Sequence, residues 1–366
     1  MPLGFLILGD ITMFEIQSKF HSYSVEVIEI LEDALSKIVI DNKVFVLIDE
    51  NVFNLYSHPI EKILKNYPML KLEATEEQKS FEQLTSIFVR LLELGFRKDC
   101  TLLVIGGGVM QDIGCFISSV LFRGVKWMLI PTTLLAQCDS CIGSKSSINI
   151  QKYKNQIGTF YPPHQIYLVF SFLKTLPEDE IRSGLGEIIK LNLLNSSYDV
   201  EKMKDNLKKF SSDFMSIQNL IIDALNIKKI YIEQDEFDKG IRNILNYGHT
   251  FGHAYESATN YAIPHGIGVT LGMLTATFFS WKLGKVSEEY YNNLMEFLKP
   301  YYEPYNQELN PNLLGSILQK IKLDKKNQGS SITCILTNGD GKMEKVSLPL
   351  EPDVKEIMND FLKIIN

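Results

Sequence analysis

The sequence lacks the features that mark membrane or secreted proteins. No apolar run among its 366 residues reaches the roughly 20 that a membrane-spanning helix needs. Residues 1–13 contain Asp10 and lack the basic start of a signal peptide. Five cysteines are an odd number for so long a chain, so we expect no disulfide framework and a reducing compartment. These absences predict a soluble, cytoplasmic protein that does not bind membranes.

Positive charge is also scarce. The chain has 37 basic and 44 acidic residues, a formal net charge of -7, which argues against a nucleic-acid partner but does not exclude a local basic pocket. Its composition, 45% hydrophobic and 22% charged, is typical of soluble globular proteins. Since one domain usually takes about 150 residues, the length predicts two domains.

The first half of the chain alternates short apolar runs with amphipathic stretches. Polar residues, glycine or proline bound each of the apolar runs, which are 44–48, 102–105, 127–130 and 166–170. Continuous runs of this length are typical of strands buried on both faces, whereas residues 81–92 are apolar at helical spacing. The pattern predicts a Rossmann-like parallel sheet covered by helices on both sides.

The pattern changes near residue 175. Thr175 to Glu178 read as a capping box that starts a helix, and helical periodicity recurs at 217–224 and 269–279. A hairpin is expected around residues 338–341. The predicted fold class is therefore α/β plus α, with an α/β domain at 1–175 followed by a mainly helical, metal-binding domain at 176–366.

A group of polar residues stands out in the second half. If their segment is one helix, Arg242, Asn246, His249 and His253 are spaced by four, three and four residues and share one narrow stripe. A solvated helix face is usually rich in lysine and glutamate, and this stripe is not, so we interpret it as a site. His249 and His253 can ligate one metal together, or one can ligate while the other transfers protons.

Two further charges occupy apolar surroundings. Glu187 lies on an otherwise apolar helix, where a carboxylate is costly unless it is paired or coordinated. Two histidines and one glutamate form a catalytic zinc pattern, although Glu187 alternatively pairs with Lys190. Lys228 continues an apolar helical series, so its ammonium either points into a cleft or snorkels to water.

Groups that suit phosphate are found in the first half. Three glycines, Gly106 to Gly108, follow a strand and precede a helix, a geometry that cradles phosphate. Asp49 and Asn51 follow another strand, where they hold a ribose hydroxyl or simply form a turn. Lysines and asparagines gather around a Gly/Ser-rich segment, which suits an anionic substrate or a plain surface loop. These residues and one aspartate are Asp139, Lys145, Asn149, Lys154 and Asn155.

Together these motifs resemble the 3-dehydroquinate synthases, within the sugar-phosphate cyclase superfamily. The resemblance runs from about Asp49 to Lys326. The motifs occur in the family order, and they are 106–112, 123–124, 131–137, 139–149, 154–155, 173–177, 184–190, 245–253, 265–266 and 324–326.

The resemblance implies an NAD-binding domain and a helical zinc domain with the active site between them. It implies zinc, or cobalt, on Glu187, His249 and His265. The implied NAD-binding residues are Asp49, Asn51, Glu76, Lys79, Gly107, Gly108, Asp112, Thr132, Thr133, Lys154 and Thr175. The implied catalytic residues are Asp139, Lys145, Asp238 and His253. The implied substrate-binding residues are Asn155, Lys190, Lys228, Arg242, Asn246 and one of Lys325 and Lys326, with Arg123 reaching a neighbouring subunit of a homodimer.

The implied reaction makes the protein a carbon–oxygen lyase of the shikimate pathway, acting on a phosphorylated sugar acid. In the family, 3-deoxy-D-arabino-heptulosonate 7-phosphate becomes 3-dehydroquinate and phosphate through transient oxidation by NAD, phosphate elimination, re-reduction and intramolecular aldol closure. Two alternatives remain: a paralogous cyclase of the inosose or valiolone type that uses another sugar phosphate, and an NAD-dependent metal alcohol dehydrogenase.

The sequence departs from the family pattern at four positions. Gln111 and Ser144 stand where the family usually has glycine, Asp238 replaces a glutamate that accepts a proton, and Ile267 replaces another glutamate. The residues implied for carboxylate binding are retained, which favours dehydroquinate synthase over its paralogues.

Overall fold

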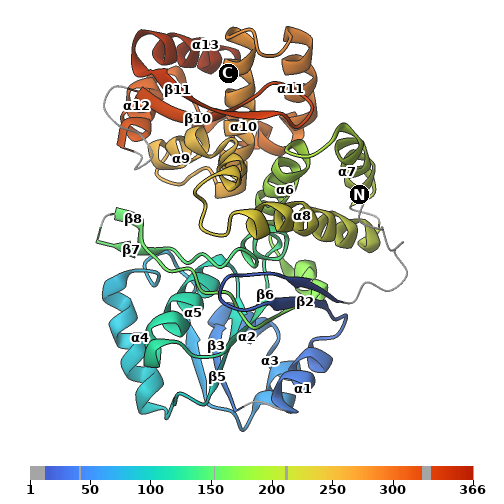
Figure 1. Cartoon of the computed structure of the whole chain (residues 1–366), viewed down its shortest axis with the longest axis vertical. Helices are drawn as coiled ribbons and strands as arrows, with labels where there is room; N and C mark the ends of the chain where they lie inside the picture. Colours follow the sequence, from blue (N-terminus) through green and yellow to red (C-terminus); the bar gives the residue numbers. More distant parts are fainter. Residues whose placement is uncertain (1–12, 41–42, 152, 211–212, 324–330, 366) are drawn as a thin grey trace. The chain divides into compact units, whose positions relative to one another are not determined.

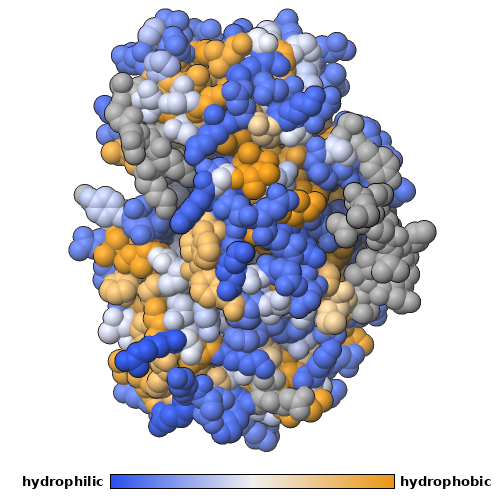
Figure 2. Space-filling model, viewed as in Figure 1, coloured by the Kyte–Doolittle hydropathy of each residue, from blue (hydrophilic) through white to orange (hydrophobic). Residues whose placement is uncertain are grey.

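A computed structural model describes residues 13–40, 43–151, 153–210, 213–323 and 331–365 (Figure 1). The chain folds into two compact units that divide between Leu176 and Pro177. Within the described part of the chain, no helix combines the length and apolar character needed to cross a membrane. Figure 2 shows hydrophobic residues mostly as small patches among hydrophilic ones on the visible face.

The first unit is built on a seven-stranded sheet. The strand order is β1-β2-β9-β6-β5-β3-β4, and every neighbouring pair is parallel except β1 with β2. The strands are β1 (Met13–Ile16), β2 (Tyr23–Val27), β3 (Val44–Asp49), β4 (Met69–Leu72), β5 (Thr101–Gly106), β6 (Trp127–Pro131) and β9 (Gln165–Leu168). The parallel sheet is confirmed, and each of the four predicted apolar runs lies wholly or largely within one of its strands.

Helices cover both faces of this sheet, as Figure 1 shows. Leu103 and Ile105 of β5 belong to a buried cluster with α1 and α3, whereas Val104 points to the opposite face. There α5 approaches so closely that a Cβ on Gly114 would lie 2.4 Å from Val104. The helices are α1 (Leu31–Ile40), α2 (Glu50–Leu55), α3 (Ser57–Leu64), α4 (Phe81–Glu93) and α5 (Gly108–Val120).

Shorter elements of the first unit carry several predicted site residues. They are a 3-10 turn (Leu121–Arg123), a π-helix (Ala136–Ser140), a hairpin of β7 (Ile148–Ile150) with β8 (Tyr153–Ile157), and a 3-10 helix (Phe170–Thr175). The predicted capping box does not form. The Thr175 hydroxyl donates to the Phe172 carbonyl, 3.1 Å away, and α6 begins at Glu178 without a side-chain cap.

The second unit is mainly helical, as predicted. Its helices are α6 (Glu178–Leu193), α7 (Ser197–Lys209), α8 (Phe214–Gln234), α9 (His249–Ala258), α10 (His265–Lys282), α11 (Glu288–Tyr302), α12 (Leu314–Leu323) and α13 (Lys355–Ile365). The expected hairpin is present as β10 (Ser331–Thr337) and β11 (Met343–Pro349). Every residue of α10 from Gly266 to Ser280 is buried, so α10 forms the centre of this unit.

Glycines allow the neighbouring helices to approach α10 closely. A Cβ on Gly186 of α6 would lie 2.2 Å from the Gly266 carbonyl oxygen, and one on Gly272 would lie 1.9 Å from that of Gly248. Real Cβ atoms do not come so near a carbonyl oxygen, so α6 and the start of α9 can pack here only with glycine at these positions.

Candidate active site

One glutamate and three histidines of the second unit converge. Glu187 lies on α6, His249 and His253 on α9, and His265 is the first residue of α10. One ligand atom from each histidine lies within 4.8 Å of the other two. Glu187 Oε1 is 3.5 Å from His249 Nε2 and 3.4 Å from His265 Nε2. Imidazole nitrogens with one carboxylate oxygen are ligands that suit zinc or cobalt.

The close packing of α6 on α10 places Glu187 beside His265. Glu187 follows Gly186, whose missing side chain admits the Gly266 backbone. The Gly266 amide donates to Ser183 Oγ at 3.0 Å, which also holds the two helices together. Pro264 precedes His265 and lacks an amide hydrogen, which suits the start of a helix. Helix α10 therefore begins at His265.

Glu187 and Lys190 form a buried ion pair within the same cluster. The two residues are 1% and 2% exposed, and the Lys190 ammonium contacts Glu187 Oε2. Burial alone would raise the pKa of Glu187, but the charges of Lys190 and His265 outweigh it and lower the pKa. The alternatives for Glu187 are thus compatible: it pairs with Lys190 and also lies against the histidines.

The carboxylate is suited to a cation that lies among the histidines. Both side-chain oxygens of Glu187 are buried, and neither accepts a well-oriented hydrogen bond from the residues that the structure describes. Burial would lower the pKa of His265, yet the carboxylates of Glu187 and Glu256 raise it. The surroundings therefore favour a positive charge at this point, which a proton on His265 or a divalent metal ion provides.

Glu256 is a member of this cluster that sequence reasoning missed. Glu256 is 9% exposed, and its Oε1 lies 3.0 Å from His265 Nδ1. Gly268 leaves room for it, because a Cβ there would lie 3.1 Å from the Glu256 carboxylate. Glu256 follows His249 by seven residues and His253 by three, so helical periodicity alone places it on the histidine face of α9.

The predicted stripe on a single helix is wrong. Residues Ile241–Asn246 form a 3-10 helix, the chain turns at Gly248 with φ of 81°, and α9 begins at His249. Gly248 packs against α10, where a Cβ would lie 2.7 Å from the Val269 carbonyl oxygen. This packing interrupts the helix between Asn246 and His249.

Other predicted residues of the second unit are buried or bonded to a nearby backbone carbonyl. Lys228 and Arg242 are 6% and 4% exposed, so the Lys228 side chain is enclosed rather than extended into water. Arg242 donates to the Glu236 carbonyl, and Asn246 Nδ2 donates to the Asn243 carbonyl at 3.0 Å. The predicted Lys325 and Lys326 lie outside the described residues.

The predicted proton acceptor Asp238 lies in the loop between α8 and the 3-10 helix. Its φ is 57°, and its carboxylate accepts from Asn243 Nδ2 at 2.9 Å. The aspartate is therefore held by Asn243 of the 3-10 helix that follows the loop.

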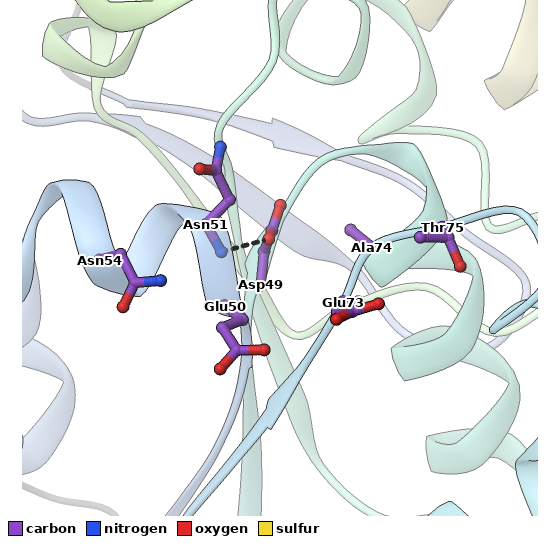
Figure 3. A pocket seen from close by; sticks show the side chains of 7 residues that line it. All are labelled: Asp49, Glu50, Asn51, Asn54, Glu73, Ala74 and Thr75. Carbon is purple, nitrogen blue, oxygen red and sulfur yellow. Dashed lines mark hydrogen bonds between the residues drawn. The ribbon is translucent and has the colours of Figure 1, made fainter.

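In the first unit, a pocket of about 480 Å³ opens beside the carboxyl ends of β3 and β4 (Figure 3). Asp49 and Asn51 line it, together with Glu50, Asn54, Glu73, Ala74 and Thr75. Asp49 Oδ1 accepts from the Asn51 amide at 2.9 Å and so caps α2. Burial raises the pKa of Asp49.

The glycine turn between β5 and α5 has one crowded and one open position. A Cβ on Gly107 would lie 2.8 Å from Thr133 Cγ2, whereas one on Gly108 would meet no atom of the described residues within 4 Å. The Thr132 amide donates to the Gly106 carbonyl at 3.1 Å, so the predicted glycines and threonines are adjacent. The open face of Gly108 at the start of α5 is suited to a phosphate group.

A second set of predicted residues forms a polar network in the first unit. Lys79 Nζ lies 3.1 Å from Asp112 Oδ2, 3.1 Å from Asn155 Oδ1 and 3.4 Å from Glu76 Oε1. Lys154 Nζ is 3.8 Å from the same Glu76 oxygen. Burial raises the pKa of Asp112 to about 6, although Lys79 opposes the shift. The structure thus brings Asn155 together with four predicted NAD-binding residues.

Four predicted residues of the first unit lie elsewhere. Asp139 belongs to the π-helix, and Lys145 is exposed in the segment that follows it. Arg123 is exposed, with φ of 64°. The Thr175 hydroxyl lies 2.8 Å from the Tyr56 hydroxyl.

The chain is similar to known proteins over most of its length. Family models described as 3-dehydroquinate synthase N-terminal and C-terminal match residues 69–183 and 184–327. A 3-dehydroquinate synthase of Alkaliphilus oremlandii (strain OhILAs) is 36% identical over 313 residues, which cover 84% of this chain and 85% of that protein.

Two solved structures share the fold. One is a 2-deoxy-scyllo-inosose synthase complexed with carbaglucose-6-phosphate, NAD+ and Co2+, with a TM-score of 0.82, 21% identity, and coverage of 95% of this chain and 100% of that one. The other is the 2-epi-5-epi-valiolone synthase of Streptomyces hygroscopicus subsp. jinggangensis 5008 with NAD+ and Zn2+ bound, with a TM-score of 0.81, 21% identity, and coverage of 95% and 99%.

Proposed function

Because the chain belongs to the 3-dehydroquinate synthase family, we propose that it converts 3-deoxy-D-arabino-heptulosonate 7-phosphate to 3-dehydroquinate and phosphate. The protein is then a carbon–oxygen lyase that uses NAD catalytically. The observation that carries the proposal is the convergence of buried Glu187 with three histidines on α6, α9 and α10.

A divalent metal fits this cluster. Glu187, His249 and His265 are the proposed ligands, since the buried Glu187 carboxylate lies against both imidazole rings and His265 is oriented by Glu256. His253 then remains for proton transfer, the second of the two roles that the i, i+4 spacing allows. Zinc and cobalt both suit this set of nitrogen and oxygen donors.

NAD fits the groups of the first unit. The acidic pocket at Asp49 and Asn51 suits a ribose, and the open Gly108 at the start of α5 suits the pyrophosphate. The family resemblance assigns the remaining contacts to the polar network and the adjacent threonines; these residues are Glu76, Lys79, Asp112, Lys154, Thr132, Thr133 and Thr175.

Both groups contribute chemistry that side chains lack: when bound, NAD accepts and returns a hydride, and the metal lowers the pKa of the alcohol from which the hydride leaves. The chain itself supplies the binding and the proton transfers. Lys190, Lys228 and Arg242 are buried cations of the second unit, which suits a substrate carrying carboxylate and phosphate groups. Arg242 and Lys228, with Lys325 or Lys326, hold the carboxylate, and Asn246 belongs to the same substrate set.

Proton transfer and phosphate binding fall to the remaining residues. A ring nitrogen of His253 delivers or takes the proton at the phosphate end, where Asn155 also binds. Asp238 accepts a proton through its carboxylate, and Asp139 and Lys145 contact the substrate. Arg123 is exposed, which supports its proposed reach into the neighbouring subunit of a homodimer. We place the enzyme in the cytoplasm.

A phosphate-release assay tests this function. The expected result is phosphate release from the heptulosonate phosphate with catalytic NAD and no accumulation of NADH. Sedoheptulose 7-phosphate and glucose 6-phosphate serve as the comparison substrates, because turnover of either alone would identify a paralogous cyclase. Stoichiometric NADH would instead identify an alcohol dehydrogenase. His249→Ala is the matched variant, and it should lose both metal and phosphate release while remaining folded.

A further inference from the structure

Gln111 occupies an unusual place for a glutamine. It lies in the first turn of α5, next to the glycine turn, and its residue is only 6% exposed. A buried amide is costly unless both its oxygen and its nitrogen form hydrogen bonds. The partners of this side chain therefore indicate why the turn accommodates it.

Both polar atoms of the Gln111 amide bond to one residue. Nε2 donates to the Ser140 backbone carbonyl at 2.5 Å, and Oε1 accepts from the Ser140 hydroxyl at 2.9 Å. Ser140 ends the π-helix that carries Asp139. The last carbonyls of a helix lack partners within it, and Gln111 supplies a donor to this one. Two bonds to a single residue fix its orientation as well as its position.

Two more side chains of α5 hold the segment that follows. Asp112 Oδ1 accepts from the Ser147 amide at 2.9 Å, and Cys115 Sγ lies 3.7 Å from the Ser144 carbonyl oxygen. Side chains from the first two turns of α5 thus contact the segment 139–147 near its start, in its middle and at its end. Between these points the backbone has φ of 107° at Gly143 and 67° at Ser144, conformations that persist where the surroundings impose them.

We propose that Gln111 is a positioning residue that holds the segment 139–147, and with it Asp139 and Lys145, against α5. The inference rests on the proposed function, in which Asp139 and Lys145 contact the substrate. Gln111 acts only through Ser140. The Gln111 amide adds two hydrogen bonds at the start of the segment, and a glycine at the same position could form neither.

Gln111→Leu tests the proposal, because leucine fills a similar volume without either hydrogen bond. Hydrogen exchange of the amides of residues 139–147 should become faster, while exchange of the amides of α5 itself stays as in the wild type. The kcat for phosphate release should fall roughly 10- to 100-fold, the loss expected when a catalytic group is displaced by about 1 Å, with metal content unchanged.

Ser118→Ala is the matched control, since Ser118 is fully buried on the same helix and its hydroxyl has no hydrogen-bond partner in the described part of the chain. It should leave both exchange and kcat unchanged. Unchanged exchange in Gln111→Leu would overturn the proposal, whatever the wild type catalyses. Faster exchange with wild-type kcat would also overturn it. Absence of phosphate release from the wild-type protein would contradict the proposed function instead, and the exchange result would still decide whether Gln111 holds the segment.

Discussion

Glu256 Oε1 and His265 Nδ1 lie 3.0 Å apart, and the opposite nitrogen of the same ring, Nε2, lies 3.4 Å from Glu187. The Glu256 carboxylate accepts the Nδ1 proton, which leaves the Nε2 lone pair directed at the centre of the cluster. Glu256 therefore selects the tautomer of His265 that can ligate a metal.

Glu256→Gln should weaken metal binding by roughly 10- to 100-fold, the usual loss when the partner of a ligating histidine is changed. Titration of zinc-free protein against a chelator of known affinity measures the effect without any assay of activity. Glu289→Gln, a change in the exposed first turn of α11, is the control and should bind zinc as the wild type does. Wild-type affinity in Glu256→Gln would exclude this orienting role.

Glu187→Ala should destabilise the metal-free protein by about 3–5 kcal/mol, since it leaves the Lys190 ammonium buried without its carboxylate partner. Urea denaturation in the presence of a chelator gives the free energy of unfolding. The double variant Glu187→Ala, Lys190→Met removes both charges and should recover most of the loss. A double variant as unstable as the single one would show that the ion pair is not the cause.

Asp112 should make the first unit less stable as the pH rises from about 4 to 6. The pKa of its carboxyl is raised from 3.8 to about 6 in the folded chain, so the folded state binds this proton more tightly than the unfolded state does. Its contribution is then largest below pH 4 and is lost as the pH rises through 6, a change of up to about 3 kcal/mol.

The difference in unfolding free energy between wild type and Asp112→Asn, followed by urea denaturation from pH 4 to 7, isolates this contribution from other titrating groups. Asp99→Asn serves as the control, because Asp99 is exposed and pairs with the Lys43 side chain at the surface. A wild-type minus Asp112→Asn difference that stays constant across this range would rule out the raised pKa.

The strands of the first unit could be predicted because burial on both faces leaves a continuous apolar run, as in Val44–Asp49 and Thr101–Gly106. Strand β1 could not, since Ile16 alone of its four residues is buried, at the edge of the sheet. The same limit applies to Gly248. Its φ of 81° depends on packing against Val269, a contact that spacing along the chain does not encode.

The cluster of histidines could be predicted in part from the sequence. Spacing placed His249 and His253 on one face, and it would have placed Glu256 there too. Its partner His265 comes from the start of another helix, so the pair exists only because α9 and α10 pack together. Long-range packing decided which of several polar residues meet.

Ser144→Gly should be more stable than Ser144→Ala by about 1 kcal/mol. Both variants lose the hydroxyl, but only alanine keeps a Cβ in the left-handed conformation at φ of 67°. That conformation costs a residue with a Cβ about 1–2 kcal/mol, and the greater chain entropy of glycine offsets part of the gain. Thermal and urea denaturation of both variants check the difference. Equal stabilities would mean that the segment relaxes to another backbone conformation when the hydroxyl is removed.

The chain should bind NAD in preference to NADP. Three carboxylates, Asp49, Glu50 and Glu73, line the pocket beside β3 and β4, where the 2′-phosphate of NADP would meet like charges (Figure 3). Asp49→Asn removes one of these charges and preserves the cap of α2, because asparagine caps a helix as well as aspartate does. The ratio of the two dissociation constants, measured by titration of each nucleotide, should therefore shift toward NADP in this variant. Asn54→Asp is the matched opposite change in the same pocket and should shift the ratio toward NAD, and a ratio that neither substitution moves would separate this pocket from the nucleotide site.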